Sequence, residues 1–203
     1  MVQKTGSVVT AERFAQGLTY EGFLDAIEGD RNKPRFQENY DGTQVPDDEV
    51  RAFRELMAKP NGPAKMLVIG EPWCPDVFRG MPVFARLAEA TGIEMRVFFR
   101  DQNKDIMAEF LNNGEYESIP VAVFYTRDME EIAHFIERPA LANREMRELL
   151  APMYARLRKP DMTDEEKAAA RKEYIDFQNG PVWANWRQET IREVLALLRE
   201  KLA

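Results

Sequence analysis

The strongest constraint on the fold is an alternation of short apolar runs and helical segments in the middle of the chain. Apolar runs such as "KMLVIG" (65–70) predict buried strands, and apolar residues with a period near 3.6 between them predict helices. In order, the predicted elements are strand 65–70, a helix ending near Gly92, strand 93–99, helix 105–114, strand 119–125 and strand 130–136. This β-α-β-α-β-β order predicts an α/β fold with a central mixed sheet, a parallel strand pair and helices on both faces.

Helical segments flank this core on both sides. Residues 1–59 predict an N-terminal helical segment, and residues 139–203 predict a C-terminal helical extension. Thr163 and Glu166 have the spacing of a capping box at the start of one helix. We expect both segments to pack on the core of residues 60–138 as one compact unit. The apolar stripes of the three C-terminal helices would then be covered by the sheet and by each other.

The composition excludes several classes of function. A net charge of −7 argues against nucleic acid and anionic membranes as partners, because both need basic patches. One cysteine and one histidine are too few for the usual Cys/His zinc sites, so we expect no metal. The sequence has no glycine-rich phosphate loop, so we also expect no cofactor. The sequence contains neither a signal peptide nor an apolar span of roughly 20 residues, which predicts a cytoplasmic protein. The oligomeric state stays open.

The stretch "EPWCPDVFRGMP" (71–82) contains the single cysteine, Cys74, directly after the first predicted strand. We expect Cys74 to lie at a helix N-terminus, where free backbone N–H groups and the helix dipole lower the pKa of a thiol. Arg79 would add positive potential. Asp76 would act against it, unless it caps the helix or pairs with Arg79 at i, i+3. A Cys-x-x-Cys pair would need a second cysteine where the chain has Val77.

These residues resemble the thioredoxin-like superfamily over residues 60–138. Pro82, eight residues after the cysteine, matches the proline in the active-site helix of thioredoxins, and "SIPV" (118–121) matches their cis-proline loop. The resemblance implies a cis Ile119–Pro120 bond beside the catalytic sulfur. A fuller resemblance is to a bacterial thioredoxin-like subgroup with a helical N-terminal segment and the pattern W-C-x-D-x-x-R-x-x-P. The matching residues are Trp73, Cys74, Asp76, Arg79 and Pro82.

Three residues depart from the thioredoxin pattern. Val77 replaces the resolving cysteine. Val68 stands where thioredoxins keep a buried acid for proton transfer, and Val97 stands where they keep the lysine partner of that acid. The departures argue against ordinary dithiol exchange and leave one cysteine at the helix tip.

The first candidate function is a monothiol thiol–disulfide oxidoreductase. Cys74, as the catalytic residue, would form a mixed disulfide that an external thiol resolves. Its partner would be a protein or a low-molecular-weight thiol or disulfide. The substrate-binding residues would be Trp73, Pro75, Asp76, Val77, Arg79, Ile119 and Pro120.

The second candidate is a non-catalytic binding module that uses the cis-proline groove, with Cys74 as an inert, buried thiol. A third, an iron–sulfur carrier assisted by glutathione, lacks the motif of the known carriers. Trp73 either shields the sulfur or fills a gap at the sheet edge. We expect His134 in the core or on a sheet face, because no acid is placed to make it a base. Trp183 and Trp186 are expected to pack together at a helix start.

Overall fold

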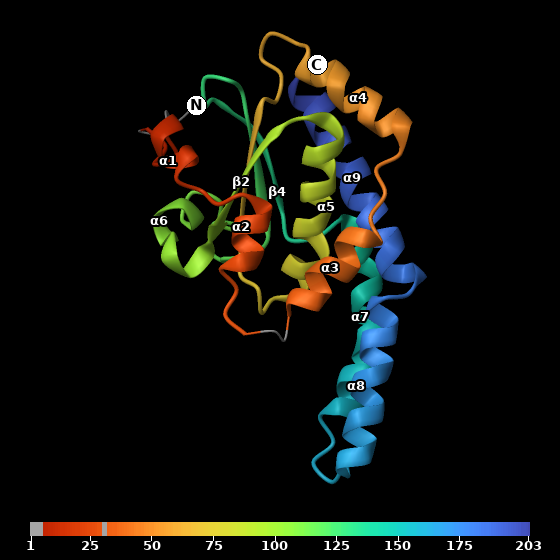
Figure 1. Ribbon diagram of the computed structural model, residues 1–203. Helices are drawn as coiled ribbons and strands as arrows, with labels where there is room; N and C mark the ends of the chain where they lie inside the picture. The colour runs from red at the N-terminus through yellow and green to blue at the C-terminus, as the bar shows by residue number, and fades with distance from the viewer. Residues whose placement is uncertain (1–5, 30–31) are drawn as a thin grey trace.

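A mixed β-sheet forms the centre of the protein (Figure 1). The structure is a computed structural model that describes residues 6–29 and 32–203. In these residues the sheet has four strands in the order β2-β1-β3-β4. β1 is parallel to β2 and antiparallel to β3, and β3 is antiparallel to β4, which confirms the predicted fold class. The strands are β1 (Lys65–Gly70), β2 (Glu94–Phe99), β3 (Val121–Tyr125) and β4 (Glu131–Ile136).

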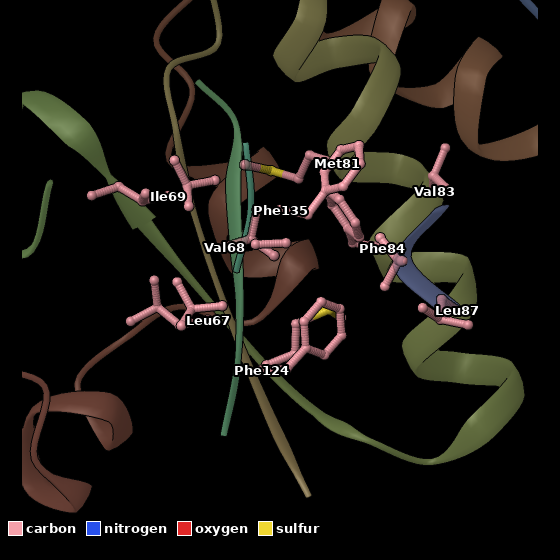
Figure 2. Close-up of a cluster of buried hydrophobic side chains, with 14 of the residues drawn as sticks. Leu67, Val68, Ile69, Met81, Val83, Phe84, Leu87, Phe124 and Phe135 are labelled. Atoms are coloured by element: carbon pink, nitrogen blue, oxygen red, sulfur yellow. The ribbon is translucent and has the colours of Figure 1, made fainter. Parts of the chain in front are cut away.

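The sheet is apolar on both faces because packed elements cover each of them. Val68 of β1 points toward Phe84 on α5 (Pro75–Thr91), whereas Leu67 and Ile69 point to the opposite face (Figure 2). All four side chains are almost completely removed from water. Full burial of a large apolar side chain contributes about 1.5–3 kcal/mol, so this core supplies much of the stability of the fold.

The helix α5 begins directly after Cys74 and runs along one face of the sheet. Pro75 occupies its first turn, where the N–H that proline lacks would have no helical partner. The helix ends at Gly92, whose φ of 85° is left-handed and favours glycine. Pro82 lies inside the helix. The start and the end of this helix are therefore as the sequence predicts.

Short helices form the N-terminal part of the structure and attach it to the core. Thr10 and Thr19 cap the first two of them with side-chain hydrogen bonds. Leu18 and Val97 exchange backbone hydrogen bonds of 2.9 and 2.8 Å, so the chain between these two helices pairs with the free edge of β2. The helices are α1 (Ala11–Ala15), α2 (Tyr20–Asp25), α3 (Lys33–Asp41) and α4 (Asp47–Met57).

The C-terminal helices divide into one that packs on the core and two that leave it. α9 (Pro181–Lys201) contacts α4, α5 and β4. α7 (Ala140–Leu157) and α8 (Asp164–Gln178) form a hairpin that extends away from the sheet (Figure 1), and the predicted capping box at Thr163 and Glu166 starts α8. The three C-terminal helices contact one another, as expected, but the sheet does not cover the length of α7 and α8. Large apolar side chains of the hairpin stay exposed, namely Leu149, Tyr154 and Ile175.

The helix predicted over 105–114 is much shorter than expected. The structure has a 3-10 turn (Arg100–Gln102) and then α6 (Lys104–Met107). Asn113 and Gly114 follow with φ of 54° and 74°. An Asn-Gly pair adopts these left-handed angles more easily than other residues, so a turn replaces the last part of the predicted helix. Within the described residues, no helix is long and apolar enough to cross a lipid bilayer.

Candidate functional site

Cys74 lies at the junction between β1 and α5, as predicted. Its backbone is extended, with φ −83° and ψ 127°. Its carbonyl oxygen accepts hydrogen bonds from the N–H groups of Val77 and Phe78, each at 3.1 Å, and so begins the helix. Its own N–H donates to the carbonyl of Glu71 at 3.2 Å. The sulfur is therefore carried by a backbone that is fixed on both sides.

The Cys74 thiol faces the loop that precedes β3. Its Sγ lies 3.8 Å from the carbonyl oxygen of Ile119, and the Ile119–Pro120 bond is cis, as expected. Gly80 of α5 lies against the same loop, because a Cβ added to it would be 3.2 Å from the Pro120 Cγ. A residue without a side chain at position 80 thus lets the helix and the loop approach closely.

A buried ionic network lies behind the thiol. Asp76 and Arg79 form the predicted i, i+3 pair, with Oδ1 3.3 Å from Nη2. Arg138, from the segment after β4, adds a two-pronged contact to the same carboxylate, with Nε 3.1 Å from Oδ1 and Nη2 2.8 Å from Oδ2. Planar guanidinium groups suit this geometry. The Asp76 carboxylate is thus shared by two arginines, only one of which was predicted.

Arg79 is completely buried, and its other contacts are polar protein groups. Its Nη1 donates to the Thr190 hydroxyl at 3.4 Å, and its Nη2 to the Glu137 carbonyl at 3.3 Å. Burial lowers the pKa of Arg79, and Asp76 opposes this effect. The guanidinium therefore holds α5, α9 and the end of β4 together.

The remaining predicted residues differ in their access to solvent. Trp73 is 55% exposed, and the Arg100 guanidinium lies 5.2 Å from the centroid of its ring. Its ring is therefore covered only in part, by Arg100 on one face. Pro75 is exposed as well, whereas Val77 is fully buried, with its methyl groups packed against Gly70. The site thus presents Trp73 and Pro75 at the surface around a half-buried Cys74.

The strand order, the cysteine at the start of α5 and the cis-proline loop are together the arrangement that the resemblance implies. A protein-family model described as thioredoxin matches residues 17–153. The chain belongs to this thioredoxin family. The chain has a single cysteine, at the start of α5, and the residue three positions later, Val77, is buried.

Solved structures agree with this thioredoxin fold. A protein of unknown function from Pseudomonas aeruginosa has a TM-score of 0.62 and 15% identity, covering 95% of this chain and 98% of its own. An HIV epitope-scaffold has a TM-score of 0.59 and 16% identity, covering 96% of this chain and 99% of its own. At these identities the likeness concerns the fold alone. No curated protein matches the chain.

In this thioredoxin-family chain, Val68 and Val97 pair directly across β1 and β2 and are both fully buried. Acids lie near the cysteine in other places. Glu71 is buried, and its Oε1 accepts a hydrogen bond from the Asp101 N–H at 2.8 Å. Burial raises the pKa of Glu71. Sequence reasoning looked for an acid within the strand and missed this one just beyond its end.

Glu137 is a second acid that the sequence did not reveal. Its backbone is left-handed, with φ 67°, and its N–H donates to the Pro120 carbonyl at 2.7 Å. Its carboxylate contacts Arg138. Burial raises the pKa of Glu137, and Asp76 raises it further. No local sequence pattern indicates this position, because the fold alone brings the end of β4 to the cis-proline loop.

The expectation of a lowered thiol pKa is wrong. Burial raises the pKa of Cys74, and this effect is the largest one on the thiol. The backbone N–H groups of Val77 and Asp76 act in the expected direction, but the negative charges of Asp76 and Glu137 add to the rise. Arg79 offers little compensation because Asp76 already balances its charge. The thiol is therefore mostly protonated at neutral pH.

His134 and the two tryptophans of α9 have other neighbours. His134 lies on β4, as expected, with its ring centroid 5.4 Å from that of Phe110. The expectation that no acid lies near it is wrong, because its Nδ1 is 2.7 Å from Glu131 Oε1. Trp183 and Trp186 are buried and pack together with ring centroids 6.2 Å apart, as expected. Among residues 6–29 and 32–203, no group of His, Cys, Asp and Glu side chains is arranged to hold a metal ion.

Proposed function

We propose that this thioredoxin-family protein is a monothiol thiol–disulfide oxidoreductase. The observation that carries the proposal is the contact of Cys74 Sγ with the cis-proline loop, 3.8 Å from the Ile119 carbonyl, beside the exposed ring of Trp73. A thiol in this position is available to a disulfide that approaches the loop. The backbone of the loop offers strand-like hydrogen bonds to an extended substrate.

The reaction has two steps. The Cys74 thiolate attacks one sulfur of a disulfide, a new S–S bond forms, the old one breaks, and the leaving thiolate takes up a proton. An external thiolate then attacks the substrate sulfur of the mixed disulfide, and Cys74 leaves as a thiolate. The external thiol must act because the chain has no second cysteine and the corresponding Val77 is buried.

The raised pKa of Cys74 determines the pH range in which the reactive thiolate is populated. At neutral pH a small fraction of the thiol is ionised, so the rate rises with pH toward the raised pKa. The thiolate that does form is a stronger nucleophile, because intrinsic nucleophilicity increases with pKa. We therefore expect slow, pH-dependent exchange with disulfides that bind at the loop.

The same pKa favours a second candidate, a non-catalytic binding module that uses the cis-proline groove. In that case the exposed Trp73 and the loop at Ile119 would hold a partner, and the protonated, half-buried Cys74 would take no part. The partner would be a protein.

The two candidates differ in one measurement. Under the first, incubation with a mixed-disulfide reagent gives one adduct on Cys74, an added low-molecular-weight thiol releases it, and Cys74→Ser abolishes both steps. Matched activity of wild type and Cys74→Ser in a thiol-transfer assay would remove the oxidoreductase and favour the module. Circular dichroism of both proteins confirms that the substitution leaves the fold intact.

The subgroup, the cellular location and the partner expected from the sequence form part of the same proposal. We propose membership in the bacterial single-cysteine subgroup with the W-C-x-D-x-x-R-x-x-P pattern and a place in the cytoplasm. The partner would be a protein or a low-molecular-weight thiol or disulfide, with no need for a cofactor. The packing of Asp76 with Arg79 supports the pattern as a structural unit rather than a set of substrate contacts.

A further inference from the structure

A pocket of about 350 Å³ lies next to the candidate site. It is formed by α3, the first turn of α5 and the last part of α8, where the hairpin meets the core (Figure 1). Pro75, the residue after Cys74, is part of its wall. The volume lies at the lower end of the range of small-molecule sites, roughly 300–1,000 Å³. The wall also includes Arg35, Phe78, Arg171, Tyr174 and Gln178.

The pocket is cationic in an acidic protein. The whole chain has a net charge of −7, yet none of the described residues that line the pocket is acidic, and two are arginines. Arg171 lies on an exposed position of α8 and forms no ion pair with any residue in the described part of the chain. Its charge is therefore available to a ligand.

The second arginine is part of the wall. The Arg35 guanidinium lies 5.4 Å from the centroid of the Phe78 ring, its Nε is 3.5 Å from the Glu38 carboxylate, and its Nη2 donates to Gln178 Oε1 at 2.5 Å. Because the Gln178 oxygen accepts the hydrogen bond from Arg35, these contacts fix the orientation of the carboxamide. The Gln178 nitrogen then points away from Arg35.

Gln178 supplies the buried polar group of the pocket. Its side chain is 2% exposed, and its Nε2 has no well-formed hydrogen bond to the described residues. Burial raises the pKa of the Tyr174 hydroxyl, and the nearby Gln178 opposes this rise. The same hydroxyl also lies 3.4 Å from that of Tyr154. A buried N–H donor without a firm acceptor favours an acceptor atom from a ligand.

We infer that this pocket binds the carboxylate end of a small acidic thiol that resolves the mixed disulfide of Cys74. Arg171 supplies the charge, and Gln178 Nε2 donates a hydrogen bond to a carboxylate oxygen. The rings of Phe78 and Tyr174 contact the apolar part of the ligand. Pro75 follows Cys74 in the chain and belongs both to the pocket wall and to the first turn of α5, so a bound molecule would lie beside the start of this helix. The inference rests on the proposed function for its chemistry.

The bound thiol releases Cys74 by thiol–disulfide exchange. The thiolate of the bound acidic thiol attacks the substrate sulfur of the mixed disulfide, a disulfide between the thiol and the substrate forms, and the Cys74–substrate S–S bond breaks. Cys74 leaves as a thiolate and takes up a proton from water. The acidic thiol is the reductant, and the substrate sulfur leaves as part of the new disulfide.

Binding is tested separately from chemistry. The probe is S-methylglutathione, which has two carboxylates and a blocked sulfur, and its diester, which has no carboxylate, is the control ligand. We expect calorimetry to show binding of the diacid, about tenfold weaker binding to Arg171→Ala, and no change for Lys167→Ala, which removes the same charge elsewhere on α8. Equal binding of the diacid and the diester, or unchanged binding to Arg171→Ala, would overturn the site.

Chemistry is tested with the Cys74 mixed disulfide. We expect reduced glutathione to release the adduct about tenfold more slowly from Arg171→Ala than from wild type, and the neutral thiol 2-mercaptoethanol to release it equally from both. Binding of S-methylglutathione without any Cys74 adduct would support the carboxylate site and refute the proposed function. A normal adduct without charge-dependent binding would refute the site and leave the proposed function standing.

Discussion

The carboxylate of Asp76 receives the Arg138 guanidinium on both of its oxygens, at 3.1 and 2.8 Å, although the two residues are 62 positions apart in the chain. The same carboxylate pairs with Arg79, which is completely buried. Asp76 thus pairs with two arginines directly behind the candidate nucleophile, and Glu137 contacts one of them, Arg138. Removal of Asp76 affects the charge of the site and the stability of the fold together.

Asp76→Ala should therefore destabilise the protein strongly. The substitution leaves Arg79 buried without its carboxylate, and breaking a buried pair from one side costs about 3–5 kcal/mol. Urea unfolding at neutral pH measures the loss. The exposed pair of Arg156 and Glu173 is the matched control, because Arg156→Ala should cost at most about 1 kcal/mol. Equal losses for the two variants would contradict a structural role for the Asp76 network.

Glu137→Gln should lower the pKa of Cys74. The Glu137 carboxylate raises that pKa by disfavouring a second negative charge nearby, so a neutral amide removes part of the rise. The pH dependence of Cys74 alkylation by iodoacetamide measures the pKa, and the variant should react faster than wild type at neutral pH. Glu130→Gln, on the exposed β3–β4 loop, should leave the profile unchanged. A pKa that stays the same or rises in Glu137→Gln would show that the two groups do not interact.

Glu71→Gln should change how stability depends on pH. Burial raises the folded-state pKa of Glu71 above its ordinary value of 4.5, so the folded state binds its proton more tightly than the unfolded state does. Stability from this group is present below pH 4.5 and is lost as the pH rises through the raised folded pKa. The glutamine keeps an acceptor for the Asp101 N–H and has no charge to desolvate.

Urea unfolding at about pH 5 and about pH 7 compares the two proteins. Glu71→Gln should gain stability relative to wild type as the pH rises between these values. A difference that is independent of pH, or a loss that grows with pH, would contradict the assignment of a raised pKa to Glu71.

Val77→Cys tests whether the buried valine sets the monothiol character of the proposed site. Its side chain is fully buried, so the smaller cysteine should cost about 1 kcal/mol or less of stability. We expect the new thiol to attack the mixed disulfide of Cys74 and release the adduct without an external thiol. Mass spectrometry of the adduct over time measures the release. Persistence of the adduct in Val77→Cys, as in wild type, would show that position 77 cannot reach the sulfur.

The sequence predicts the central elements well because their signals are local. The apolar run of β1 and the Pro75 and Gly92 ends of α5 each depend on a few adjacent residues. The helix over 105–114 was predicted too long, because Phe110 and Leu111 continue the apolar spacing of Ile106 and Met107 but lie outside the helix, which ends at Met107. Apolar stripes on α7 and α8 indicate that a partner is needed, but not which surface provides it.

The site was predicted only in part for a similar reason. Cys74 and Pro120 follow from motif spacing, and the Asp76–Arg79 pair follows from helix geometry. Arg138 and the carboxylate of Glu137 reach the site through the antiparallel pairing of β3 with β4, which no short pattern encodes. The thiol pKa was predicted in the wrong direction because burial is a property of the assembled fold, and it outweighs the helix N-terminus here.

The turn of the α7–α8 hairpin is a suitable site for inserting a tag or a reporter domain. Its turn, residues 158–163, lies at the far end from the sheet (Figure 1), and helices of this length extend about 1.5 Å per residue. A peptide tag or reporter domain inserted before the Thr163 cap would therefore project into solvent, well separated from Cys74. The hairpin could serve as a spacer that ties the protein to a sensor surface while its thiol stays open to the solution.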